Sequence, residues 1–358
     1  ASIVAVALVF TEYLNAIWEI TMGTQFNLPV TFVISLITIW GLTGINLFGV
    51  SMSGKFQVIF STIKVGAVGA IIGMTLTSFS TGNVENFTNQ FWPETFGWET
   101  VLAIGAALRY SFFAFSGWEG ATYMAEEVKD PQRTLPLSLF LGIGGVTLLY
   151  IGTNLGYLYQ LNVQEIIKNK WVATAAMKVV LGATGGVLIS VAVAINAFGN
   201  ISTQILCKGR TWHAMARDGL FFDKFKVLHP VFKSPNNALI GQGVWATILL
   251  IFSVIATYLQ SGVSGSNAYE IMIDFFSATS TIFNLLTFGA IYVLRKKWPH
   301  KNRPYKALLY PWSMIIVLIL YSSFLVITLI TAFIPSIVGL LLTFSGTFYY
   351  FIKIKAKK

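Results

Sequence analysis

The residues best suited to chemistry lie in one stretch, Phe112 to Pro136, which reads FFAFSGWEGATYMAEEVKDPQRTLP. It begins as an apolar helix, and Ser116 and Gly117 interrupt that helix just before Glu119. A carboxylate inside a hydrophobic span is energetically costly and marks an ion or substrate pathway. Secondary transporters build substrate sites from helices that are broken near the bilayer midplane. The stretch therefore predicts a substrate or ion site.

The backbone around the interruption supplies the candidate ligands. If the helix unwinds, the carbonyls of Phe113, Ala114 and Ser116 lose their partners within the helix and can accept bonds from an ammonium group. Lipid offers no donors, so such carbonyls are tolerated only where they face a cavity or a ligand. The alternative is a continuous helix in which Gly117 allows a close helix contact and Glu119 bonds to a neighbouring side chain.

Aromatic residues surround the same point. Aromatic stripes on membrane helices usually serve packing. The position of Phe113 and Trp118 beside the interruption makes them candidates for a gate over a bound substrate.

A second candidate is Lys64, nine residues after Lys55. At 1.5 Å per residue, Lys64 lies ~13 Å into the membrane, which is too deep for easy snorkelling. It should be paired with carbonyls or an acid, or else be partly deprotonated. A buried ammonium can occupy the place of a sodium ion, or it can serve as a fixed cation that pins helices together.

Other polar side chains lie within or beside apolar spans. Asn196 and Asn200 share one helix face, where cavity lining and helix-helix hydrogen bonding are equally plausible. For Arg109 we expect interfacial snorkelling rather than substrate contact, and for Asp274 a place near the outer interface. Glu12 receives no role.

These residues must be positioned by membrane helices. Hydrophobic residues make up 55% of the 358 and charged residues only 11%, against roughly 25% charged residues in soluble domains. Several apolar runs exceed the ~18 residues that a helix needs to cross the bilayer, and the alternating pattern of a barrel is missing. The sequence predicts an all-α polytopic membrane protein with about ten spans: Ala1 to Trp18, Pro29 to Val50, Phe56 to Thr77, Val101 to Glu126, Leu135 to Leu161, Gly182 to Cys207, Asn237 to Gln260, Ile271 to Leu294, Leu308 to Ile330, and Ile334 to Ile354.

The distribution of the basic residues behind the net charge of +10 indicates how the chain is oriented in the membrane. With the first span running outward, 19 of the 24 basic residues fall in inner loops and the tail, as the positive-inside rule requires. This places the carboxyl terminus in the cytoplasm and argues against a nucleic-acid partner. The outer segment Val163 to Leu181 resembles a lid or an interfacial helix. Because Ala1 lies within an apolar run without a methionine, we expect further residues upstream.

Several absences narrow the function. Cys207 is the single cysteine, and the three histidines fall in loops, so no metal site is expected. The sequence contains no GxxxxGK[ST] loop for ATP. We therefore expect neither an enzyme nor a pump, and no cofactor.

Four ordered motifs carry a family resemblance: FFAFSGWEG with EEVKDPQRTLP, GINLFGVSMSGKFQ at 44–57, FGNISTQILCKGRTWHAMARDGLF at 198–221, and FGAIYVLRKKWPHKNRPYKALLYP at 288–311. With these the chain resembles the amino acid, polyamine and organocation (APC) superfamily, especially bacterial amino acid permeases close to the L-type exchangers.

The resemblance implies a LeuT-like fold of two inverted five-helix repeats whose first and sixth helices unwind, followed by two peripheral helices. Val101 to Glu126 then corresponds to the sixth helix, and the first two helices have no counterpart, so the chain looks truncated at its amino terminus. It would form one transmembrane transporter domain, with the rest of the first repeat at 1–78, the second repeat at 99–295, and peripheral helices at 308–354.

The resemblance also implies roles for the candidate residues. Phe113, Ala114, Ser116 and Gly117 correspond to the part of the site that binds the substrate ammonium, and Phe113 also resembles the family's aromatic gate. Glu119 aligns with a position that senses protons in some members. Lys64 is similar to a lysine that replaces sodium. The half of the site that binds the substrate carboxylate would lie outside this chain.

The implied function is a sodium-independent permease of the plasma membrane, which exchanges amino acids or couples their transport to protons by alternating access. Neutral amino acids are the favoured substrates. The expected partner besides the substrate is the lipid bilayer that surrounds the protein. The alternatives are an antiporter of cationic amino acids or polyamines and a membrane protein that senses amino acids without transporting them. An ion channel is disfavoured because no repeated filter sequence appears, and the chain could also be an inactive remnant.

Overall fold

The computed structural model describes residues 1–48, 51–88, 95–123, 125, 128–260, 268–301, 303 and 307–351. Throughout these ranges the regular structure is helical, with no strand. The prediction of an all-α protein is confirmed. Some residues named above lie outside the described residues. They are Met124, Glu126 and Glu127 of the stretch Phe112 to Pro136, and the lysines of the tail from Lys353 on.

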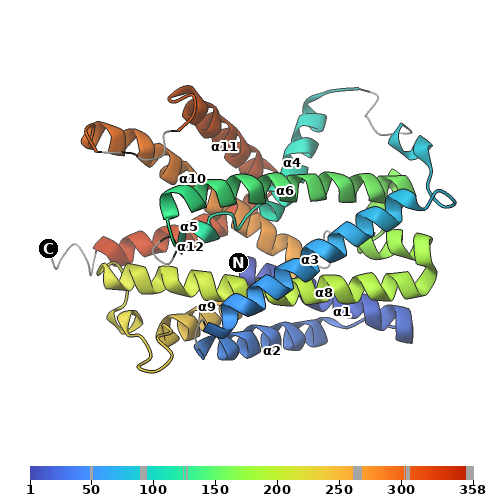
Figure 1. The fold of residues 1–358 in the computed structure, drawn as a ribbon, viewed down its shortest axis with the longest axis horizontal. Helices are drawn as coiled ribbons and strands as arrows, with labels where there is room; N and C mark the ends of the chain where they lie inside the picture. The colour runs from blue at the N-terminus through green and yellow to red at the C-terminus, as the bar shows by residue number, and fades with distance from the viewer. Residues whose placement is uncertain are drawn as a thin grey trace. The chain divides into compact units, whose positions relative to one another are not determined.

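Twelve α-helices and two short 3-10 helices follow one another along the described ranges (Figure 1). They are α1 (Ser2–Met22), α2 (Leu28–Leu47), α3 (Ser51–Thr77), η1 (Val84–Phe87), α4 (Trp98–Ala114), α5 (Gly120–Tyr123), α6 (Pro131–Gln160), α7 (Val163–Lys168), α8 (Val172–Arg217), η3 (Asp223–Lys226), α9 (Asn236–Gln260), α10 (Ala268–Lys297), α11 (Trp312–Thr331) and α12 (Phe333–Tyr349).

Each predicted span falls on a helix, but the helices differ in length. Seven of them are long and apolar enough to cross a membrane: α1, α2, α6, α8, α9, α10 and α11. The apolar parts of α3 and α12 are shorter, at Ser61–Thr77 and Phe333–Phe348. The fourth predicted span is divided, because α4 ends at Ala114. The chain is a multi-pass membrane protein.

Several hydroxyl groups in these helices bond within their own helix. The hydroxyls of Thr11, Thr38 and Thr43 donate to the carbonyls four residues earlier, over 2.7 to 3.1 Å. Such bonds let a hydroxyl sit in an apolar helix without a partner in the lipid. At the start of α2, the side chain of Asn27 accepts from the amide of Val30 and caps the helix.

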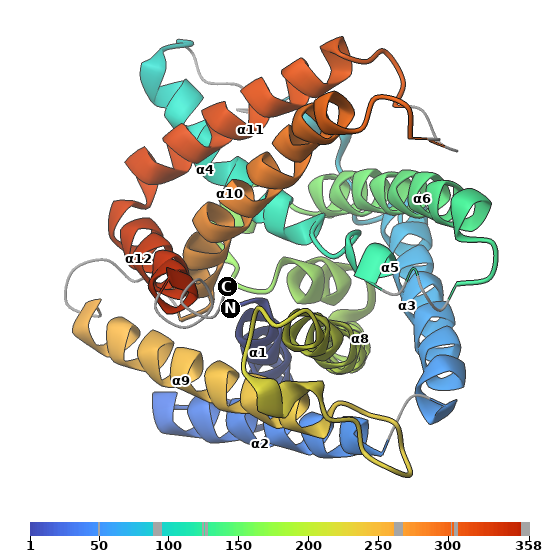
Figure 2. The same ribbon diagram turned by 90° about the vertical axis from the view of Figure 1, so that its left-hand side faces the viewer.

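The chain divides into two compact units. Unit 2 comprises residues 3–94 and 138–258 and contains most of α1 to α3 and α6 to α9. In it α8 packs against α2 and α3 (Figure 2), and Asn46 Nδ2 of α2 donates to Ser202 Oγ of α8 over 3.2 Å. Trp40 Nε1 of α2 donates to Thr247 Oγ1 of α9. These amide and indole bonds join three apolar helices within one unit.

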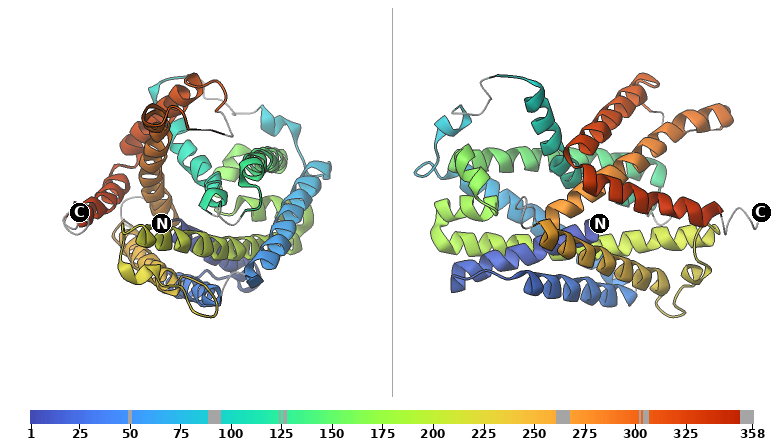
Figure 3. Two further views of the ribbon diagram at one scale, coloured as in Figure 1. Left: turned by 60° about the vertical axis from the view of Figure 1, so that its left-hand side comes forward. Right: turned by 180° about the vertical axis from the view of Figure 1, so that it is seen from behind.

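Unit 1 comprises residues 1–2, 95–137 and 259–358. Within it α10 packs against α11, α12 and α4, and α11 also contacts α4 (Figure 3). Phe112 of α4 lies against two rings of α11, Tyr321 and Phe324, with ring centroids 5.6 and 4.8 Å apart. Unit 1 therefore holds the interrupted helix against α10 and α11. The predicted assignment of inverted repeats stays a prediction.

One glycine bends the longest helix. α8 kinks at Gly182, whose φ and ψ are 66° and −158°, a backbone region that only glycine adopts readily. The kink falls at the predicted boundary between the outer segment Val163 to Leu181 and the span that begins at Gly182. The outer segment itself consists of α7 and the first turns of α8.

We predict that Gly182→Ala lowers the free energy of unfolding by about 1 to 3 kcal/mol. An added Cβ would meet no atom within 4 Å, so the loss comes from backbone strain alone. Gly144→Ala is the matched control, because its Cβ is equally unhindered and alanine favours the helix by up to about 1 kcal/mol. Unfolding of the purified protein in detergent measures both. Equal stability of the two variants would contradict the strain.

Candidate functional site

The helix is interrupted where the sequence predicted. α4 ends at Ala114, residues 115–119 form turns, and the short α5 begins at Gly120. Gly117 has a φ of +104°, which residues with a side chain rarely adopt. The alternative of a continuous helix through this point is therefore wrong.

The interruption is closed by short-range hydrogen bonds. The amide and the hydroxyl of Ser116 both donate to the carbonyl of Phe113, over 3.1 and 2.7 Å. The amide of Gly117 donates to Glu119 Oε2 over 2.9 Å. The Phe113 carbonyl, predicted to face a substrate, thus uses both lone pairs within the turn. An ammonium group would have to replace Ser116 as its donor.

Glu119 therefore has a position that the sequence did not predict. Its carboxylate lies beside the turn and caps a backbone amide that the interruption leaves without a helical partner. Glu119 is partly buried. A hydrogen bond to a charged acceptor is stronger than one to a neutral acceptor. The conformation of the turn therefore depends on the charge of Glu119.

The two gate candidates differ in their surroundings. The ring of Phe113 makes edge-on contacts with Tyr269 and Phe276 of α10, at centroid distances of 6.2 and 5.4 Å. The neighbouring Trp118 is partly buried. Phe113 therefore joins the end of α4 to the beginning of α10. No pattern in the sequence predicted these two partners. Its gating role, like that of Trp118, stays a prediction.

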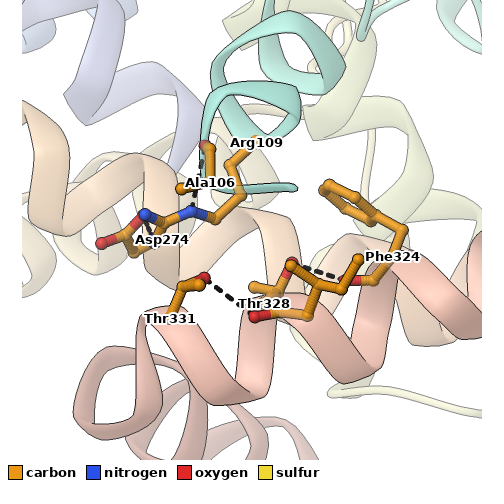
Figure 4. Close-up of polar contacts among 7 residues, drawn as sticks. Ala106, Arg109, Asp274, Phe324, Thr328 and Thr331 are labelled. Atoms are coloured by element: carbon orange, nitrogen blue, oxygen red, sulfur yellow. Dashed lines mark hydrogen bonds and ion pairs between the residues drawn. The ribbon is translucent and has the colours of Figure 1, made fainter. Parts of the chain in front are cut away.

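A buried ion pair lies about one and a half turns before the interruption. Arg109 Nη1 of α4 contacts Asp274 Oδ1 of α10 at 2.5 Å, and the two side chains are only 9% and 16% exposed (Figure 4). Arg109 Nε also donates to the carbonyl of Ala106 over 3.3 Å. The expectation of a snorkelling Arg109 is wrong, because its side chain is buried against Asp274. The expectation of an interfacial Asp274 missed this partner, and its depth in the membrane stays a prediction. A lone cation and a lone anion in apolar spans need each other, and this signal could have predicted the pair.

Two threonine hydroxyls of α11 that lie beside this pair bond within their own helix. Thr328 and Thr331 of α11 each donate to a carbonyl of their own helix over 2.8 Å (Figure 4). The carboxylate of Asp274 thus depends on Arg109 for its charge compensation. Because the pair joins α4 to α10, it fixes the segment that leads into the interruption.

The remaining candidates lie in unit 2. Lys64 is partly buried on α3, and in the described part of the chain no acid forms an ion pair with it. Asn200 accepts from Gln204 over 2.9 Å, and Gln204 accepts from Lys208 over 2.8 Å, in a ladder along α8. Asn196 is partly buried on the same helix. The predicted roles of Lys64, Asn196 and Asn200 stay predictions.

The outer segment is tied to α1. Lys170 Nζ, in the link between α7 and α8, contacts Glu12 Oε2 at 2.6 Å. The sequence assigned no role to Glu12. This ion pair fixes the segment that the sequence described as a lid or an interfacial helix. As for metals, no group of three potential ligands occurs in the ranges that the structure covers.

Fold and site together define a helical membrane protein with an interrupted, charge-capped helix packed against a neighbour. Residues 1–354 match the amino acid permease family, and the chain belongs to that family. It is 29% identical to the serine/threonine exchanger SteT of Bacillus subtilis over 89% of this chain and 68% of that protein. It is 27% identical to the b(0,+)-type amino acid transporter 1 of Mus musculus over 91% of this chain and 62% of that protein. It is 25% identical to the cystine/glutamate transporter of Homo sapiens over 77% of this chain and 52% of that protein. The chain thus spans between about half and two thirds of the length of these relatives.

We predict that Arg109→Met destabilises the protein by about 3 to 5 kcal/mol, because it leaves the Asp274 carboxylate buried without a counter-ion. The double variant Arg109→Met with Asp274→Asn should recover most of that loss, since no charge remains buried. The exposed pair of Lys226 and Asp223 provides the control, and Lys226→Met should cost less than about 1 kcal/mol. Unfolding in detergent reports all three. If the double variant were as unstable as the single one, the pairing would not be the cause.

Proposed function

We propose that this chain forms the larger part of a sodium-independent amino acid permease that works by alternating access. The observation that carries the proposal is the interrupted helix from α4 to α5, with Glu119 capping the turn. Interrupted helices place polar backbone where only a cavity or a ligand can receive it. Membership of the amino acid permease family supplies the substrate class.

Neutral amino acids are the proposed substrates. Two relatives are named a serine/threonine exchanger and a large neutral amino acids transporter subunit. The aromatic surroundings of the turn, formed by Phe113, Tyr269 and Phe276, suit an uncharged side chain. One relative is named an exchanger, which favours exchange as the mode of transport.

The proposed substrate ammonium binds at the carbonyls of Phe113, Ala114 and Ser116, next to Gly117. For the Phe113 carbonyl this requires displacement of Ser116, whose bonds to it are 2.7 and 3.1 Å long. Substrate binding would thereby be coupled to the shape of the turn. Phe113 and Trp118 act as gates in this proposal.

The proposed coupling groups are Glu119 and Lys64. Protonation of Glu119 would weaken its bond to the Gly117 amide, so that the charge and the turn change together. Lys64 supplies a fixed cation on α3 in place of sodium, and Asn196 and Asn200 line the pathway. The basic inner loops support a plasma-membrane protein with a cytoplasmic carboxyl terminus.

We expect the full protein, as its gene encodes it, to show counterflow in proteoliposomes. Vesicles loaded with unlabelled serine should take up labelled serine or leucine saturably, and replacement of sodium by choline should not change the rate. Vesicles without internal amino acid separate exchange from proton symport. The absence of saturable flux at millimolar substrate would end the transport proposal, and binding without flux would favour a sensor.

We predict that Glu119→Gln keeps exchange but flattens its dependence on pH, because glutamine still accepts from the Gly117 amide and cannot titrate. Glu119→Ala removes the acceptor as well, so the turn loses a hydrogen bond to a charged group, which contributes about 1.5 to 3 kcal/mol. Exchange should then fall by about tenfold or more.

The matched control is Glu99→Gln, an exposed glutamate in the first turn of the same helix, which should leave both rate and pH dependence unchanged. A wild-type pH profile in Glu119→Gln would remove Glu119 from the coupling role.

A further inference from the structure

The chain following α10 forms a closed basic turn. α10 ends with Arg295, Lys296 and Lys297, and five cations lie between Arg295 and Arg303. The guanidinium of Arg303 donates to three carbonyls, at Trp298 over 2.6 Å, Lys301 over 3.1 Å and Pro299 over 3.2 Å. These bonds hold Trp298, Pro299 and Lys301 to the side chain of Arg303.

An open pocket of about 390 Å³ lies in this turn, lined by Lys297, Trp298, Pro299, His300 and Lys301. The ammonium groups of Lys297 and Lys301 lie 5.2 and 5.5 Å from the ring centroid of Trp298. Trp298 is 47% exposed. The pocket thus presents two ammonium groups and an indole ring to its surroundings.

In the part of the chain that the structure describes, no ion pair joins an acid to the cations of this turn. No aspartate or glutamate follows Asp274 in the sequence. Among the described residues, the ion pairs involve other cations. Arg295 stacks on the ring of Tyr310 at 3.6 Å, and Arg303 donates to carbonyls. Of the three remaining cations, Lys296, Lys297 and Lys301, the last two line the pocket and can bind an external anion.

The position of the turn at the end of a membrane span identifies the kind of anion. α10 is long and apolar enough to cross the bilayer, so a tryptophan directly after its last residue lies at headgroup level. Leu308, Leu309 and Trp312, where the chain enters α11, are 69 to 81% exposed. Apolar side chains of this kind fit acyl chains, whereas a soluble anion would gain nothing from them.

We infer that the turn from Lys297 to Lys301 binds the phosphate of an anionic phospholipid, with both ammonium groups on the headgroup and Trp298 at the boundary to the acyl chains. Basic clusters next to a membrane helix attract anionic lipids. This site lies apart from the interrupted helix and does not depend on the proposed transport function.

Titration of the full protein in detergent with dioctanoyl phosphatidylglycerol and with dioctanoyl phosphatidylcholine tests the site. The wild type should bind phosphatidylglycerol more tightly. Each lysine contributes about fivefold, so Lys297→Gln with Lys301→Gln should weaken binding by about 25-fold. Lys297→Arg with Lys301→Arg should retain it. Lys224→Gln with Lys233→Gln removes the same charge from another exposed loop and should have no effect.

Three results would overturn the inference. The first is equal affinity of the wild type for the two lipids. The second is an equal loss in the Lys224 and Lys233 control, which would indicate a general charge effect. The third is displacement of phosphatidylglycerol by millimolar inorganic phosphate, which would indicate a site for soluble anions.

Discussion

Every backbone group inside a lipid bilayer must find its hydrogen-bond partner within the protein, because the hydrocarbon offers none. An interrupted helix is therefore possible only where side chains, a water-filled cavity or a ligand replace the missing helical bonds. At the end of α4, Ser116 and Glu119 provide these replacements, through the Phe113 carbonyl and the Gly117 amide. In the proposed function, a substrate ammonium competes with Ser116 for the Phe113 carbonyl, and a proton competes with the Gly117 amide for Glu119. The hydrogen bonds that stabilise the interruption are therefore the ones that the proposed chemistry would break.

The charges around this turn follow the same constraint. Arg109 and Asp274 are buried as a pair, and Glu12 is paired with Lys170. Each pair joins elements that are distant in the sequence, since one ion alone would be costly in an apolar environment. The cations in the last turn of α10 and directly after it have no acidic neighbour along the chain, because no aspartate or glutamate follows Asp274 in the sequence. They end a membrane span, where the lipid surface can supply the anion.

Much of the fold and part of the site could be predicted from the sequence. The apolar runs predicted the helical class and the approximate positions of the spans, and the predicted start of a span at Gly182 coincides with a bend in α8. The position of the interruption followed from Ser116 and Gly117 beside a carboxylate. Sequence reasoning went wrong for Arg109 and Asp274, because hydropathy gives the depth of each charge along its own helix but says nothing of the neighbouring helix.

The sequence by itself determined that this is a helical membrane protein of the amino acid permease type, and it predicted a substrate site at residues 113–119. Length, hydropathy and ordered motifs are local properties of the chain, so they can be read without the fold. Only the tertiary structure decided that Phe113 contacts Tyr269 and Phe276, and that Arg109 meets Asp274 across 165 residues. Such contacts depend on which helix faces pack together, and that choice minimises the unpaired polar surface of the whole bundle.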